Sequence, residues 1–210
     1  MTSIYPPDQL SPLSSKPPEL LEINSLSTCF NEDDGAVRML LLLSPTCSLC
    51  LEGASEIEDT VLKKVSEAAV RVYAVWLPIL KTDTADRVAQ AMGRLPDSRV
   101  RHFWDSKAEL AEKYSHVLGL EADLEGWSIT SIFSRLVAAY NCSLGYSGPS
   151  PAWDVYMLFG RTAEWKSGPP APDFWMHQLK LLKLNRLNGP RFAGEVSRLL
   201  RQPAAKVRDD

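Results

Sequence analysis

The chain has 210 residues, of which 45% are hydrophobic and 23% charged, enough for one globular domain with extensions. Its net charge of −3 argues against a protein that binds nucleic acids by neutralising phosphates, so we expect no nucleic-acid partner. The first residues lack the basic and apolar regions of a secretory signal, and the longest purely apolar stretch, Met39 to Leu43, is too short to cross a bilayer. We therefore expect a cytoplasmic protein without membrane contact, in a compartment that keeps thiols reduced.

The N-terminal part of the chain combines a lead-in with the first strand and helix. Residues 1–35 are rich in Pro, Ser and acidic side chains, which predicts a flexible lead-in. Val37 to Leu43 is a near-continuous apolar run, typical of a central strand covered on both faces. An amphipathic helix is predicted next, because apolar residues then recur at spacings of three and four: Ala54, Ile57, Val61, Val65 and Ala68.

The same alternation of strand and helix continues along the chain. A second strand is predicted over 69–77 and a short helix follows, which Asp83 can cap. A third strand is predicted over 99–104, and Ser106 and Glu109 have the spacing of a capping box for the next helix. Strands separated by helices need crossover connections, so we expect a largely parallel sheet.

The C-terminal part departs from this alternation. An insertion is predicted over about 119–150, and a hairpin then pairs 154–159 with 162–165. A helix is predicted to carry Phe174, Met176, Leu179 and Leu182 on one side. Residues 185–210 are predicted to form a basic C-terminal helix and tail, with the helix over 189–202.

The residues that carry chemistry are Cys47-Ser48-Leu49-Cys50, between an apolar strand and an amphipathic helix. Unpaired N–H groups and the helix dipole favour negative charge at a helix N-terminus, so the thiolate of Cys47 should be stabilised there. Cys50 lies one turn deeper and can attack a mixed disulfide formed on Cys47. The sequence thus predicts Cys47 as the attacking thiolate and Cys50 as the resolving thiol.

This order of elements resembles the thioredoxin-like family over about residues 36–184. The resemblance rests on a strand, a C-x-x-C at a helix start, two further alternations, and a Pro-preceded hairpin with a last helix. It implies an α/β fold in which a central mixed sheet, parallel strands plus a C-terminal antiparallel hairpin, is flanked by helices, with extensions at both ends. It also implies a thiol–disulfide oxidoreductase that needs no cofactor, acts on a disulfide-containing protein or a small-molecule thiol substrate, and is recycled by a reductase or a thiol reductant.

The resemblance also implies a substrate groove beside the two cysteines. In the family a cis-proline before the hairpin faces the C-x-x-C; Pro151, after Ser150, is the candidate here, and Pro149 is the alternative. The residue before the first cysteine is Thr46, where the family usually has Trp, and the inner dipeptide is Ser48-Leu49 in place of Gly-Pro. These five residues are the groove candidates: Thr46, Ser48, Leu49, Ser150 and Pro151. The family also uses a buried carboxylate as a proton acceptor, for which no residue is assigned.

Two alternatives remain open at this stage. The fold can serve as a non-catalytic interaction module with inert buried thiols. A zinc half-site is the other alternative, and it would need two more ligands from Cys29, Cys142, His102, His116 and His177. For His102 and His177 we expect structural positions, since neither is paired with the cysteines by spacing.

Overall fold

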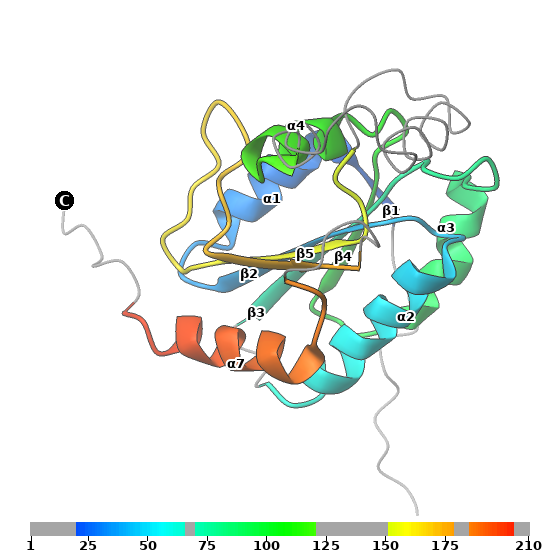
Figure 1. Ribbon diagram of the computed structural model, residues 1–210. Coiled ribbons are helices and arrows are strands. Elements are labelled where there is room, and N and C mark those ends of the chain that lie inside the picture. Colours follow the sequence, from blue (N-terminus) through cyan, green and yellow to red (C-terminus); the bar gives the residue numbers. More distant parts are fainter. Residues whose placement is uncertain (1–19, 66–69, 121–150, 179–184, 204–210) are drawn as a thin grey trace, which may run out of the picture.

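The computed structural model describes residues 20–65, 70–120, 151–178 and 185–203, and a six-stranded mixed sheet lies at its centre (Figure 1). The strands are β1 (Leu20–Glu22), β2 (Val37–Leu43), β3 (Val70–Trp76), β4 (Val100–Trp104), β5 (Val155–Phe159) and β6 (Phe174–His177). They follow the order β1-β4-β3-β2-β5-β6. The first four of the sequence run parallel, whereas β5 is antiparallel to β2 and β6 to β5.

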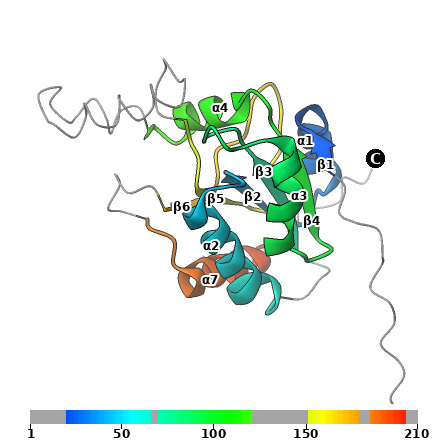
Figure 2. The same cartoon turned by 90° about the vertical axis from the view of Figure 1, so that its right-hand side faces the viewer.

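Helices cover both faces of this sheet (Figures 1 and 2). One face carries α1 (Leu26–Glu32), which follows the 3₁₀ turn η1 (Ile23–Ser25), and α4 (Glu109–Val117). The other face carries α2 (Ser48–Ile57) with its π-helical continuation η2 (Glu58–Leu62), α3 (Ala85–Ala91) with the 3₁₀ turn η4 (Met92–Arg94), and α7 (Gly189–Leu200). None of the helices that the structure describes has the length and apolar character needed to span a bilayer.

Strand β2 is the centre of the molecule, as its sequence predicted. All seven of its residues are buried, and alternate side chains enter two different apolar cores. Leu41 packs on the side of α2 and α7, whereas Leu42 packs on the side of α1 and α4. Strand β2 has hydrogen-bonded neighbours on both edges, which fix its position up to its carboxyl end. A short loop, Ser44 to Thr46, then leads to Cys47.

The predicted hairpin exists, but its second strand was placed wrongly. β5 pairs with Phe174–His177, which was predicted to begin a helix, and 162–165 form no strand. Phe174 and Met176 face one core while Trp175 faces the other, so the two-residue period of a strand suits this segment. The long connection between β5 and β6 is what separates the two strands in sequence.

The ends of the domain also differ from the predicted boundaries. Residues 20–32, predicted as part of a flexible lead-in, form β1 and α1; β1 pairs with β4, and Phe30 of α1 is fully buried. The predicted C-terminal helix forms as α7, and its Phe192 and Val196 belong to the core of the same domain. The predicted insertion over 119–150 falls almost wholly on residues outside those described.

Two predicted helix caps are replaced by other contacts. Thr84 is the N-cap residue of α3, because the carboxylate of Asp83 turns toward the loop after β2. Ser106 and Glu109 do not form the predicted capping box, since Ala108 is the N-cap residue of α4. The carboxylate of Asp105 instead accepts the N–H of Leu110 at 2.8 Å. Of the two aspartates, Asp105 accepts from the helix that follows it, whereas Asp83 accepts from the loop after β2.

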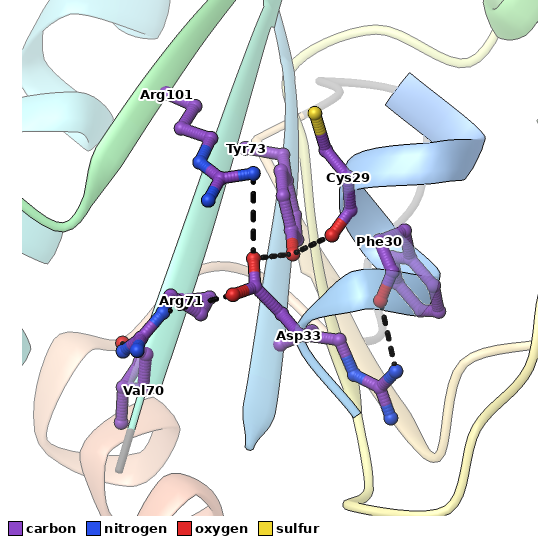
Figure 3. A network of polar contacts seen from close by, with 8 residues as sticks. Cys29, Phe30, Asp33, Val70, Arg71, Tyr73 and Arg101 are labelled. Carbon is purple, nitrogen blue, oxygen red and sulfur yellow. Dashed lines mark hydrogen bonds and ion pairs between the residues drawn. The ribbon is translucent and has the colours of Figure 1, made fainter. Parts of the chain in front are cut away.

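A polar network stabilises the end of the sheet at which β2 and β3 begin (Figure 3). Asp33 accepts a hydrogen bond from the Tyr73 hydroxyl at 2.6 Å and one from Nε of Arg71 at 3.0 Å. Nη1 of Arg101 lies 3.7 Å from the same carboxylate. These contacts connect α1 to β3 and β4 at the end of the sheet opposite to the cysteines.

Candidate functional site

The candidate site begins with the loop that leaves β2, Ser44 to Thr46, which Asp83 holds in place. One oxygen of the Asp83 carboxylate accepts from the Ser44 hydroxyl at 2.8 Å; the other accepts from the backbone N–H and the hydroxyl of Thr46, at 3.1 and 2.5 Å. The Thr46 hydroxyl also contacts the hydroxyl of Thr82 at 2.6 Å. The residue that precedes Cys47 is therefore fixed from two sides.

Cys47 is the N-cap residue of α2, and its thiol is half-buried. Cys47 and Cys50 are both thiols in this structure, without a disulfide between them. The Cys50 thiol hydrogen-bonds to Cys47 and lowers its pKa to about 7, helped by the backbone N–H groups of Cys50 and Leu49 and opposed by burial. The two backbone N–H groups are the part of this stabilisation that the helix N-terminus provides. At neutral pH a large fraction of Cys47 is therefore thiolate.

Cys50 has the opposite character. Its side chain is fully buried, and burial raises the pKa of its thiol well above the ordinary value. The thiol hydrogen-bonds to the carboxylate of Asp154, a residue that is 2% exposed. Burial raises the pKa of Asp154 to about 6, although the hydrogen bonds from Tyr156 and Cys50 favour its ionised form. A proton acceptor thus lies against the thiol that is harder to ionise.

Asp154 reaches this position because β5 is antiparallel to β2. Val155 pairs with Leu42, so the residue before β5 lies beside the end of β2, under the start of α2. Its backbone has a φ of 55°, in the left-handed region that Asp and Asn adopt more readily than most residues. Sequence reasoning assigned no carboxylate to the site. The available signal was an aspartate at the first position of an otherwise apolar predicted strand.

Two further polar side chains, Tyr156 and Gln178, extend the hydrogen-bond network of Asp154. The Tyr156 hydroxyl donates to Oδ1 of Asp154 at 2.8 Å and receives a hydrogen bond from Nε2 of Gln178 at 3.1 Å. The same amide group donates to the carbonyl of Leu49, in the first turn of α2, at 3.1 Å. Gly53 leaves room for these groups, because a Cβ there would lie 1.9 Å from the Tyr156 hydroxyl.

Of the five predicted groove residues, the structure describes four, and three of these lie next to the cysteines in the chain. Thr46, Ser48 and Leu49 flank the cysteines, and Ser48 is exposed. Pro151 is buried, and the next residue, Ala152, donates its N–H to Ala111 of α4. Ser150 and Pro149 lie outside the described residues, and so does the peptide bond proposed to be cis. Their part in a groove stays a prediction.

The two histidines of the sheet, His102 and His177, are both buried, and their structural role stays a prediction. His102 is 1% exposed; its Nδ1 accepts from Nε1 of Trp76 at 3.1 Å, and burial lowers its pKa to about 4. His177 is fully buried at the end of β6. In the described part of the chain, no three His, Cys, Asp or Glu side chains lie close enough together to hold a metal ion.

No family model and no curated protein sequence matches the chain. Solved structures similar to it include a secreted disulfide oxidoreductase of Mycobacterium tuberculosis homologous to DsbE of E. coli, with a TM-score of 0.44 and 9% identity over 80% of this chain and 85% of that one. A putative protein disulfide isomerase from Bacteroides thetaiotaomicron has a TM-score of 0.44 and 12% sequence identity, and the match covers 81% of this chain and 77% of that one. A thiol-disulfide isomerase from Corynebacterium glutamicum has a TM-score of 0.41 and 12% sequence identity, and the match covers 82% of this chain and 85% of that one.

The order of strands and the place of the C-x-x-C decide the fold class. Parallel β2 and β3 lie beside the antiparallel pair β5 and β6, and Cys47 follows β2 at the start of α2. The fold is thioredoxin-like. In this thioredoxin-like fold, β4 and β1 extend the sheet on the side of β3. The site lies at the end of the sheet where β2 finishes and β5 begins.

Proposed function

We propose that the protein is a thiol–disulfide oxidoreductase that uses Cys47 and Cys50 as its redox pair. One observation carries the proposal: the half-buried Cys47, with a pKa lowered to about 7, is hydrogen-bonded to a buried Cys50 whose thiol contacts the Asp154 carboxylate. A nucleophilic thiolate, a resolving thiol and a proton acceptor are thus adjacent. This arrangement supports two successive thiol–disulfide exchanges.

In the first exchange, the Cys47 thiolate attacks one sulfur of a substrate disulfide. A bond forms between Cys47 and that sulfur, the substrate S–S bond breaks, and the other substrate sulfur leaves as a thiolate that takes up a proton. The half-buried position of Cys47 allows this attack, whereas the buried Cys50 is protected from it.

In the second exchange, Cys50 transfers its proton to Asp154 and attacks the sulfur of Cys47. The Cys47–Cys50 disulfide forms, the bond between Cys47 and the substrate sulfur breaks, and that sulfur leaves as a thiolate that takes up a proton. Two electrons have then moved from the protein to the substrate. The contact between Cys50 and Asp154 matters here because burial holds the pKa of the Cys50 thiol far above neutrality.

The first experiment is a redox titration in which alkylation and mass spectrometry report on Cys47 and Cys50. We expect one two-electron transition between about −270 and −120 mV, the range of thioredoxin to strongly oxidising thiol–disulfide proteins. Cys47→Ser should abolish disulfide reduction, and Cys50→Ser should accumulate the mixed disulfide. Cys29→Ser is the matched control, since Cys29 is also half-buried but lies in α1. Two thiols that never pair would contradict the proposal.

The partners that follow from this chemistry are of two kinds: a disulfide-containing protein or small-molecule thiol substrate, and a reductase or thiol reductant that regenerates the dithiol. We propose the cytoplasm as the place of action, where such reductants are abundant. Partner binding that survives replacement of both Cys47 and Cys50 by Ser, without any redox transition, would favour the interaction module instead.

A further inference from the structure

The hydroxyl of Tyr156 occupies a defined place in a chain of hydrogen bonds within an otherwise apolar core. It receives a hydrogen bond from Nε2 of Gln178 at 3.1 Å, so its own proton is directed to Oδ1 of Asp154 at 2.8 Å. Gln178 is itself held at two points, because its backbone N–H donates to the carbonyl of Asp154 at 3.0 Å and its side chain donates to the carbonyl of Leu49. The direction of each donor is thereby determined.

The packing of α2 preserves this chain of contacts. A Cβ at Gly53 would lie 1.9 Å from the Tyr156 hydroxyl and 2.1 Å from Nε2 of Gln178. The helix therefore approaches both groups as closely as a residue without a side chain allows. Tyr156 is fully buried, so water does not compete for its hydroxyl.

We propose that Tyr156 and Gln178 are positioning residues that aim the Asp154 carboxylate at Cys50 and keep it ready to accept the thiol proton. This inference rests on the proposed function, since it assigns a role in the second exchange. The Tyr156 hydrogen bond stabilises the ionised carboxylate, and Gln178 keeps the hydroxyl in the orientation that makes this bond.

Among the described groups that face Asp154, Tyr156 is the hydrogen-bond donor that does not itself react with the substrate. Cys47 and Cys50 approach it from the start of α2, and both disfavour additional negative charge nearby when ionised. The paired residues of β2 at this end are the apolar Leu41 and Leu42. On β6, His177 pairs with Val155, whose side chain belongs to the opposite core, and Gln178 contributes a neutral amide. Within the described residues, the hydrogen bonds that favour the ionised Asp154 come from Tyr156 and Cys50.

The test measures the second exchange separately from the first. The aromatic disulfide dithiobis(nitrobenzoate) is added to the reduced 210-residue chain, with Cys29→Ser and Cys142→Ser so that only the C-x-x-C reacts. Attack by Cys47 releases one nitrothiobenzoate, and attack by Cys50 on the resulting mixed disulfide releases a second. Stopped-flow absorbance then follows the two releases as a function of pH.

We expect Tyr156→Phe to move the midpoint of the second release to higher pH by about one unit, which slows it about tenfold below that midpoint. The reason is that Asp154 then holds its proton more tightly. Gln178→Met should shift the midpoint in the same direction, and the first release should keep its pH profile in both variants. Gln178→Met also decides the matter if Tyr156→Phe does not fold.

Tyr73→Phe is the matched control. Tyr73 is also buried and also donates to an aspartate, Asp33 at 2.6 Å, but at the other end of the sheet (Figure 3). It should lose stability without moving the midpoint of the second release. The inference would be overturned if Tyr156→Phe and Gln178→Met both fold and their second release has the same pH midpoint as that of Tyr73→Phe. A parent protein that releases only one nitrothiobenzoate would instead overturn the proposed function.

Discussion

At the residue scale, Asp154 combines a burial cost with a chemical task. Its pKa is raised from 3.8 to about 6, so the folded state binds this proton more tightly than the unfolded chain does. The contribution of Asp154 to stability is therefore greatest below about pH 4, falls as the pH rises to about 6, and stays low above that. Above about pH 6 the ionised, buried carboxylate that accepts the proton in the second exchange therefore lowers the free energy of unfolding.

This cost predicts the effect of Asp154→Asn on stability. Because Asn does not ionise, the variant should be more stable than the parent above about pH 6, by up to roughly 3 kcal/mol, and the difference should vanish near pH 4. Urea unfolding at both pH values, with a reductant present, measures it. The same variant should slow the second exchange. A stability difference that does not change with pH would contradict the assignment.

At the element scale, α2 is shaped by what lies beneath it. Its Gly53 is an unfavourable residue in a helix interior by intrinsic propensity, yet a Cβ there would meet Tyr156 and Gln178. The helix thus gives up some of its own stability so that β5 and the end of β6 can approach it.

Two glycine substitutions separate these effects. Gly53→Ala should destabilise the protein by about 2 kcal/mol or more and impair the second exchange, because Tyr156 must move. Gly194→Ala in α7, where nothing lies within 4 Å of the added Cβ, should stabilise it by up to about 1 kcal/mol. Thermal unfolding of both variants provides the comparison. A Gly53→Ala variant as stable as Gly194→Ala would show that the approach of α2 is looser than described.

At the scale of the whole molecule, the two ends of the sheet have different tasks. The end near Asp33 connects α1 to β3 and β4 through Tyr73, Arg71 and Arg101, whereas the opposite end carries the cysteines. Between them lies the apolar interior of β2. Contacts that are far apart and share no partner add independently to stability.

This separation predicts that Asp33→Ala affects the fold and not the redox pair. Loss of the acceptor leaves the Tyr73 hydroxyl and two guanidinium groups with fewer partners, so we expect a destabilisation of about 2 to 3 kcal/mol. The redox potential of Cys47 and Cys50 should not change. Urea unfolding and the redox titration, carried out on the same preparation, measure both quantities. A changed potential would show that the two ends are coupled.

Much of the fold could be predicted from local pattern, because the pattern has a direct physical cause. The apolar run of β2 indicates burial on both faces, and the helical spacing after Cys50 indicates α2. The C-x-x-C between them placed the two thiols at a helix start. The short segment Phe174–His177 was misread as helix, because four apolar or aromatic residues do not distinguish the two periods and only pairing with β5 decides the matter.

The sequence by itself therefore determined the strand-and-helix alternation and the pair of cysteines, both of which depend on neighbours along the chain. Only the tertiary structure decided what surrounds the pair. Asp154 and Gln178 are more than 100 residues from Cys50 along the chain, yet the antiparallel register of β5 and β6 brings them under α2. Asp83 likewise looks like a helix cap and instead holds Thr46. Burial and long-range pairing decide the role of such a side chain, and neither is visible in its local sequence.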